Sequence, residues 1–186
     1  MDQDRPRADR NAAVAPRVLI VEPSRNAINV LARRIADAGF RVAAADGVQS
    51  AMAEMHRVRP DLVLAELRLE RGSGVELVRM VREDAANCDL PLIMIGGRSE
   101  AGAAVRALRA GADDAVRRPF DFDVLIARMG RQLARARSLR ELRAANAALD
   151  ARVVTRAIEL GEVRDRLVSV EAERRALQML VRARAA

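Results

Sequence analysis

The chain has 186 residues, of which 51% are apolar and 32% are charged, proportions typical of a globular protein and unlike those of disordered or membrane chains. Its formal net charge is +7, but the positive charges are all arginines scattered among acids, and aromatic residues make up only 2%. The composition therefore excludes the aromatic stacking platforms of single-strand binders. No zinc-finger or leucine-zipper basic-region pattern is present either, and nucleic acid is not expected as a partner.

Targeting and redox features are few. The single cysteine, Cys88, has no partner for an internal disulfide, and the single histidine, His56, excludes a multi-histidine metal site. No run approaches the roughly 18 apolar residues of a membrane span, and the start of the chain lacks the apolar core of a signal peptide. We expect a cytoplasmic protein with no membrane partner. Residues 1–16, which are polar and interrupted by Pro6 and Pro16, are predicted to be a disordered leader.

Short apolar runs alternate with helical periods from Arg17 onward. The runs typical of buried strands are Arg17–Glu22, Arg41–Ala45, Asp61–Leu67, Pro91–Ile95 and Asp114–Arg117. The helical periods cover Asn26–Ala38, Val48–Val58, Val75–Arg82, Glu100–Ala110 and a helix that begins near Asp121. Apolar strands that alternate with helices predict an α/β domain with a doubly wound, five-stranded parallel sheet, covered by helices on both faces.

In such sheets, ligands bind beyond the carboxyl ends of the strands. Four segments that reach this edge resemble those of response-regulator receiver domains, which have a CheY-like or flavodoxin-like fold. VLIVEPS is similar to the family's first strand with its acidic pair, and PDLVLAELRL to the strand that carries the phosphoacceptor aspartate. PLIMIGG resembles the strand that ends in threonine or serine, and GADDAVRRPF the segment with the invariant lysine. The resemblance runs in order over residues 17–136 and implies a receiver domain there.

The positions that correspond to the family's chemistry nevertheless differ from its pattern. The acidic pair corresponds to Glu22 and Pro23, and Pro23 lacks the oxygen with which the second acid binds Mg²⁺. The phosphoacceptor corresponds to Glu66, whose extra methylene displaces its oxygens from the position that in-line attack requires. No cofactor is therefore expected, and Mg²⁺ binding is expected to be weak or absent.

The family's switch residues are also replaced. Gly96 has no hydroxyl for a phosphoryl oxygen, and Ala115 stands where the family has an aromatic side chain. Arg118 replaces the invariant lysine and is expected to form a planar two-point ion pair with Glu66. The site is therefore interpreted as a pseudo-receiver that is locked without phosphate. The alternative interpretation is that Glu66 is a remnant without a signalling role and that Glu22 is a plain surface acid.

Apolar residues continue with a seven-residue period after the receiver-like region, which predicts a C-terminal coiled-coil helix at residues 137–186. Position a holds Leu139, Asn146, Val153, Leu160, Leu167, Arg174 and Val181, and position d holds Leu142, Leu149, Arg156, Val163, Val170 and Leu177. The register extends over about six heptads, more than the three or four that support a coiled coil. The alternative is a single amphipathic helix packed on its own receiver domain.

Asn146 at an a position favours a parallel, in-register two-stranded coil. Attractive pairs of g and e residues across such a dimer are Glu159 with Arg164 and Arg166 with Glu171. Both features predict a parallel homodimer. Departures from the pattern are Arg156 and Arg174 in the core, Gly161 at b and Ile158 at f.

The segment ANAALDARVVTRAIELGEV resembles signalling helices that join receiver or sensor domains to kinase or cyclase domains, but no catalytic motif is found and no enzyme activity is expected. We predict a stand-alone atypical response regulator that acts as a phosphorylation-independent adaptor in a bacterial two-component pathway. Its partners would be a histidine kinase, a phosphotransfer protein or another signalling regulator. Two alternatives remain. One is a phosphorelay regulator with an unconventional acceptor, for which Asp61 or Asp113 would be needed, and the other is an Arg-rich nucleic-acid-binding regulator.

Overall fold

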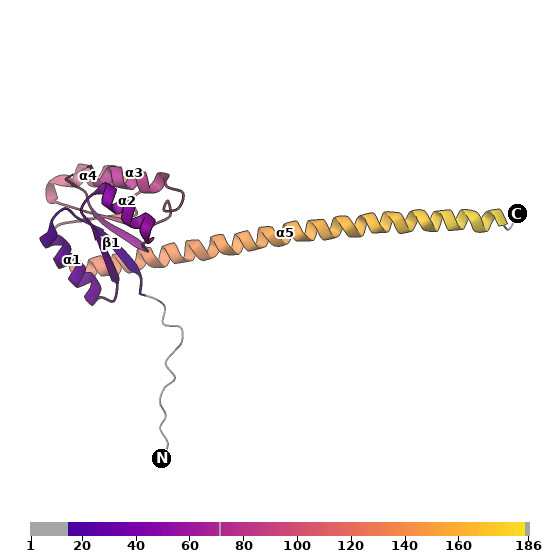
Figure 1. The fold of residues 1–186 in the computed structure, drawn as a ribbon, viewed down its shortest axis with the longest axis horizontal. Helices are drawn as coiled ribbons and strands as arrows, with labels where there is room; N and C mark the ends of the chain where they lie inside the picture. The colour runs from indigo at the N-terminus through magenta and orange to yellow at the C-terminus, as the bar shows by residue number, and fades with distance from the viewer. Residues whose placement is uncertain (1–14, 71, 185–186) are drawn as a thin grey trace, which may run out of the picture. The chain divides into compact units, whose positions relative to one another are not determined.

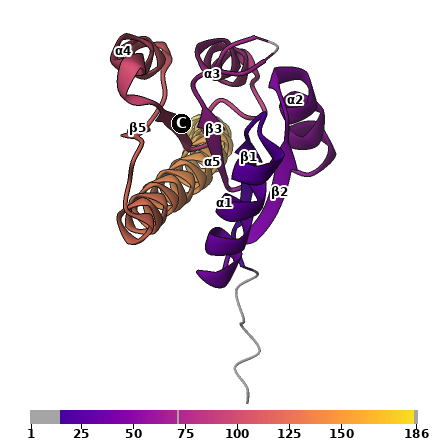
Figure 2. The same ribbon diagram turned by 90° about the vertical axis from the view of Figure 1, so that its left-hand side faces the viewer.

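The computed structural model describes residues 15–70 and 72–184, and their strands form one parallel sheet (Figures 1 and 2). The strands are β1 (Arg17–Val21), β2 (Arg41–Ala45), β3 (Leu62–Glu66), β4 (Leu92–Gly96) and β5 (Asp114–Arg117). Their order in the sheet is β2-β1-β3-β4-β5, and every neighbouring pair is parallel. The predicted doubly wound fold is therefore confirmed.

Helices cover both faces of the sheet. They are α1 (Arg25–Asp37), α2 (Val48–Arg57), α3 (Gly74–Glu83), α4 (Ala101–Ala110), which follows the 3-10 helix η1 (Arg98–Glu100), and α5 (Phe122–Arg184). Figure 2 shows α2, α3 and α4 on one face, and α1 and the beginning of α5 on the other. The chain thus alternates strand and helix in the order that the sequence predicted, and the strand boundaries agree to within one residue.

Two apolar cores form because side chains along a strand alternate between the faces of a sheet. On β1, Leu19 and Val21 pack in the cluster under α2, α3 and α4, whereas Val18 and Ile20 pack against α1 and α5. All four side chains have zero exposure. A central strand that is buried on both faces explains the uninterrupted apolar run in the sequence.

Two serines cap the helices that follow the loops of the candidate site. The Ser24 hydroxyl caps α1 by accepting a hydrogen bond from the Ala27 amide at 3.4 Å, and Ser73 caps α3 in the same way through the Glu76 amide at 3.1 Å. Such caps satisfy amides that have no partner within the helix. The loops after β1 and β3 therefore end at defined positions, and the side chains that they carry are held close to the sheet edge.

The chain divides into two compact units, and the boundary between Arg137 and Ser138 falls within helix α5. Its first part belongs to the receiver-like unit, where Leu125 and Met129 are fully buried. Every residue from Ser138 to Ala183 is exposed. Most of the predicted leader, residues 1–14, and the last two residues of the predicted coiled coil lie outside the described residues. Within the described part of the chain, no helix has the length and apolar character to span a membrane.

Candidate functional site

Four of the predicted site residues lie at one edge of the sheet, because parallel strands end together. Ala65 pairs with Val21, Glu66 with Ile95, and Gly96 with Arg117. This register places Glu22, Glu66, Gly96 and Arg118 at the carboxyl ends of β1, β3, β4 and β5, which is the edge where doubly wound sheets bind ligands. Ala115 lies within β5, opposite Met94.

Arg118 joins two carboxylates through one nitrogen. Its Nη2 donates a hydrogen bond to Glu66 Oε2 at 2.8 Å and another to Glu22 Oε2 at 2.9 Å. The predicted two-point contact between Arg118 and Glu66 is therefore wrong in its geometry, because Glu22 takes the second bond. The Arg118 Nε is buried without a hydrogen-bond partner among the described residues, and the guanidinium carbon lies 5.9 Å from the centre of the Phe120 ring.

Glu22 is part of this cluster and not a surface acid. Only 5% of the residue is exposed, and its Oε1 accepts a hydrogen bond from the Ser24 amide at 3.0 Å. The interpretation of Glu22 as a plain surface acid is therefore wrong. The reason is that the short loop after β1 turns into α1 at Ser24 and holds the Glu22 side chain against the end of β5. We define Glu22, Glu66 and Arg118 as the ion cluster.

One acid of the ion cluster, Glu66, has a raised pKa. The pKa of Glu66 is raised from 4.5 to about 7, and burial is the largest cause. The positive charge of Arg118 lowers this pKa, whereas the charge and hydrogen bonding of Glu22 raise it. Glu100 adds a smaller increase. One guanidinium shared by two carboxylates does not compensate for the loss of water around Glu66. A pKa raised in this way favours the neutral form of the Glu66 carboxyl over a wider pH range than that of an ordinary glutamate.

The space beside Gly96 is filled by Leu67. A Cβ atom placed on Gly96 would overlap Leu67 Cδ1 and would lie 3.0 Å from Glu100 Oε2. Leu67 is 5% exposed, and Glu100 is held by the Gly97 amide at 2.8 Å and by Arg68 at 3.1 Å. A hydroxyl side chain at this position would have to displace a packed leucine.

A small cavity of about 40 Å³ lies behind this leucine. Its walls include Leu67, Gly96, Ala101, Ala104 and Ala115. Ala115 is only partly buried and packs against the core under α2, α3 and α4. Gly96 and Ala115 therefore carry neither the hydroxyl nor the aromatic side chain that the family resemblance implied at these two positions.

Magnesium is the cation that the resemblance implies, and the residues present do not fit it. Pro23 offers no side-chain oxygen where a second acid would stand, and the Arg118 Nη2 lies within bonding distance of both remaining carboxylates. Hard divalent cations need several oxygen ligands. Among residues 15–70 and 72–184, no group of three or more acidic, histidine or cysteine side chains is arranged to hold a metal.

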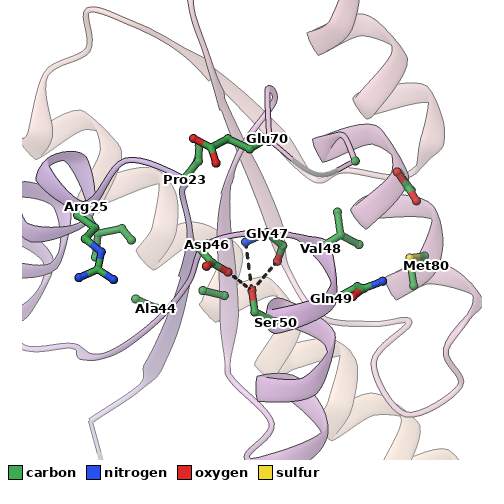
Figure 3. Close-up of a pocket in the computed structure, with 14 residues that line it drawn as sticks. Pro23, Arg25, Ala44, Asp46, Gly47, Val48, Gln49, Ser50, Glu70 and Met80 are labelled. Atoms are coloured by element: carbon green, nitrogen blue, oxygen red, sulfur yellow. Dashed lines mark hydrogen bonds between the residues drawn. The ribbon is translucent and has the colours of Figure 1, made fainter.

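An open pocket of about 1030 Å³ lies next to Pro23 (Figure 3). Its rim carries Arg25 and the acids Asp46, Glu70 and Glu76, and its lining includes no member of the ion cluster. The Ser50 hydroxyl accepts a hydrogen bond from the Gly47 amide at 3.1 Å and donates one to Asp46 at 2.6 Å. These bonds, drawn in Figure 3, organise the beginning of α2.

The two aspartates considered as alternative acceptors have structural partners at the opposite edge of the sheet. Asp61 accepts a hydrogen bond from the Arg17 amide at 2.8 Å. Asp113 accepts one from the Leu92 amide at 2.9 Å and forms an ion pair with Arg82 at 2.8 Å. Both carboxylates directly precede their strands, so they lie at the amino ends of β3 and β5, opposite the edge that carries Glu66.

Two residues that shape the site, Leu67 and Glu100, were not predicted from the sequence. Glu100 lies three residues after Gly97, the spacing at which a side chain reaches back to the amide at the start of a helix, so its position contained a usable signal. Leu67 gave none, because a leucine after a buried strand is compatible with many packing directions.

The fold and the edge with Glu66 and Arg118 are those of a receiver-type α/β domain. Residues 18–130 match the family described as the response regulator receiver domain, and the chain belongs to this family. It is 31% identical over 116 residues to the phosphate regulon transcriptional regulatory protein PhoB of Klebsiella pneumoniae, covering 62% of this chain and 51% of that protein. It is 36% identical over 112 residues to the KDP operon transcriptional regulatory protein KdpE of Escherichia coli, covering 60% and 48%.

Solved structures agree with this assignment. The crystal structure of a putative response regulator from Chloroflexus aurantiacus is similar with a TM-score of 0.62 and 25% identity, covering 64% of this chain and 98% of that chain. The chemotaxis response regulator CheY4 of Vibrio cholerae shares the fold, with a TM-score of 0.59, 22% identity, and coverage of 63% and 98%. The chain spans about half the length of the curated relatives that it matches.

Proposed function

We propose that this receiver-family chain is a phosphorylation-independent signalling adaptor in a two-component pathway. The observation that carries the proposal is the single Arg118 nitrogen bound to both Glu22 and Glu66. In this arrangement the guanidinium is already bonded to the carboxyl group at the acceptor position. An incoming phosphoryl group would have to break this pair without a metal ion to offset its charge.

Two further features support loss of phosphoryl transfer. The Leu67 side chain fills the space beside Gly96, where a phosphoryl oxygen would need a hydrogen-bond donor. Pro23 removes an oxygen ligand, and transfer to a carboxylate depends on a bound cation to stabilise the developing charge. The acceptor position, the metal position and the hydroxyl position are therefore changed together, and we propose no enzymatic role for the chain.

The proposed adaptor acts as a parallel homodimer through a coiled coil at residues 137–186, with the receiver domain at residues 17–136. Support comes from the exposed apolar side chains at positions a and d, such as Leu160 at 69% and Val163 at 62% exposure. Burying such a stripe is the usual source of coiled-coil stability. Arginines of this segment alternate with acids, which favours pairing between helices over binding to a nucleic-acid backbone.

Partners of the adaptor would be a histidine kinase, a phosphotransfer protein or another signalling regulator. The relatives named above are transcriptional regulators by their names, but the chain matches only about half of each. DNA binding is therefore not part of the proposal, which concerns the receiver domain and its helix.

The test is incubation with acetyl phosphate, with and without Mg²⁺, followed by intact mass measurement and a check for acid-labile adducts. No adduct is expected. A matched variant, Glu66→Asp, is also expected to stay unmodified, because Pro23 and Leu67 remain in place. A receiver domain with a complete acidic pair serves as the positive control. A stable phosphoryl adduct on any carboxylate of the natural chain would contradict the proposal.

A further inference from the structure

The ion cluster contains one more negative charge than positive charge. The side chains of Glu22 and Glu66 are only 7% and 13% exposed, and both bond to the one guanidinium of Arg118. With both acids ionised, the cluster would carry an unbalanced charge of about one unit at the edge of the core. Unpaired charge in a poorly solvated position is strongly disfavoured.

No described cation other than Arg118 bonds to Glu22 or Glu66. The charged groups on the elements around Glu66 are Glu22 after β1, Asp46 after β2, Arg68 and Glu70 after β3, Arg98 and Glu100 at η1, and Arg117 and Arg118 at the end of β5. Arg68 pairs with Glu100. Arg98 lines an open apolar groove with Pro119 and Phe120. Of the described arginines, Arg118 is the one that bonds to both acids.

We propose that Glu22 and Glu66 hold one proton between them, so that the site binds a proton where relatives in the family bind a metal ion and a phosphoryl group. The inference rests on the proposed function, because a cation or phosphoryl group in the same place would compete with the proton. One acid then stays ionised and forms a one-to-one ion pair with Arg118, and the other is neutral.

Gain or loss of the proton changes the hydrogen bonds within the ion cluster itself. The pKa of Glu66, raised by burial to about 7, means that both states are populated near neutral pH. When Glu66 is neutral, Glu22 pairs with Arg118 alone, and when it is ionised, two carboxylates compete for one nitrogen. Arg118 directly precedes residues 119–121, which lead into α5, so loss of the proton changes the bonding of a residue at the beginning of that connection.

Protons can reach the cluster without unfolding of the domain. The Arg118 side chain is 38% exposed and lines the open groove of about 640 Å³ between α1 and the turn before α5. Glu22 and Glu66 bond to Arg118 but do not line this groove. The cluster is therefore shielded enough to disfavour two charges and open enough to exchange a proton with solvent.

The test is a carboxyl-carbon NMR titration of the full chain, labelled on glutamate, from about pH 9 to about pH 5, a range that brackets both ordinary and raised carboxyl values. Glu66→Gln and Glu22→Gln assign the signals. We expect one glutamate signal with a midpoint near pH 7. In Glu22→Gln the proton affinity of Glu66 is expected to fall at least about tenfold, because Arg118 then serves one acid. Glu100→Gln, which removes a weaker neighbour, is the matched control and is expected to shift the midpoint less.

Three results would overturn the proton site. The first is that no glutamate of the natural chain titrates above the ordinary range, and the second is that the Glu66 midpoint is unchanged in Glu22→Gln. The third is that the Glu66 midpoint falls on addition of millimolar Mg²⁺, which would indicate a cation site. Infrared detection of a protonated carboxyl band in the natural chain at neutral pH provides a second measurement that needs no variant. A phosphoryl adduct would contradict the proposed function, whereas a missing titration contradicts the proton site alone.

Discussion

Leucines at the centre of the sheet are sealed from solvent, whereas leucines of the same size beyond Ser138 are open to it. Leu92 on β4 has zero exposure, and Leu160 on α5 is 69% exposed. Both regions have a regular apolar pattern in the sequence: the strands are uninterrupted apolar runs, and the helix has apolar residues three and four positions apart. The receiver-like unit thus buries its pattern within one chain, but the second unit does not.

The difference shows which region of the chain buries its own apolar residues. Helices in water gain most of their stability from packing an apolar face, and a long helix without such packing is marginal. The described residues from Ser138 to Ala183 are all exposed, and the ion pair of Arg175 with Glu171 at 3.9 Å joins two residues of the same helix. In the proposed dimer a partner helix would cover its apolar stripe, and the predictions below compare that proposal with the core of the receiver-like unit, which one chain buries by itself.

Removal of residues 138–186 is expected to have the largest effect, complete loss of self-association with a folded receiver domain remaining. The reason is that the exposed stripe leaves with the segment while both buried cores stay intact. Light scattering and circular dichroism on the full and shortened chains measure the two properties. A shortened chain that still dimerises would place the interface on the globular unit and remove the contrast between the regions.

The same substitution in the two regions gives a matched pair, Leu92→Ala and Leu160→Ala. The first leaves a cavity in the core and is expected to lower the free energy of unfolding by about 2–5 kcal/mol. The second is expected to leave it within about 0.5 kcal/mol but to weaken dimerisation roughly tenfold or more. Urea unfolding of the receiver domain and sedimentation of the dimer provide the two readouts. Equal effects on unfolding would mean that the helix beyond Ser138 packs on the receiver domain.

Sequence patterns predicted the receiver fold well because its elements depend on local signals. The strand runs are apolar on both faces, and Ser24 and Ser73 mark helix starts by their capping chemistry. The approach of Glu66 to Arg118 was also predictable, since both residues end parallel strands of one sheet. A family resemblance over four segments added the topology that periodicity alone does not provide.

Details of the site were not predictable, because they depend on how side chains share space. Nothing in the spacing of Glu22 and Arg118, 96 residues apart, indicates that they bond. The position of Leu67 beside Gly96 depends on a rotamer and on the packing around it. The heptad pattern of the C-terminal segment, in contrast, was clear from the sequence. The structure of a single chain does not test whether two such helices associate.

Two ion pairs, one in the receiver-like unit and one in the C-terminal segment, allow the same comparison. Arg118→Ala strands two buried carboxylates and is expected to lower the free energy of unfolding by about 1–3 kcal/mol, between the values for exposed and fully buried pairs. Arg175→Ala removes an exposed pair within one helix and is expected to cost less than about 0.5 kcal/mol. A double-mutant cycle of Arg118→Ala with Glu66→Ala measures their coupling directly. A coupling energy of zero would mean that Glu66 is a relic without a structural role.

The smallest expected effect is a pH dependence that belongs to the receiver domain alone. Folding raises the pKa of Glu66 from 4.5 to about 7, so the folded chain binds this proton more tightly than the unfolded chain. The resulting stabilisation is complete below about pH 4.5 and is lost as the pH rises through about 7. Because water still reaches the cluster through Arg118, we expect a loss of only about 1 kcal/mol.

Other acids of the receiver domain act in the opposite direction and must be subtracted. Hydrogen bonds from Arg57 and Asn87 lower the pKa of Glu54 and Asp84, so their stabilisation is present at higher pH and is lost as the pH falls. The difference between the natural chain and Glu66→Gln, followed by urea unfolding from about pH 5 to about pH 8, removes these contributions. The difference is expected to persist when residues 138–186 are absent, because the ion cluster lies entirely within the receiver domain. A difference that vanishes with the helix would tie the proton to the C-terminal segment and break the separation between the two regions.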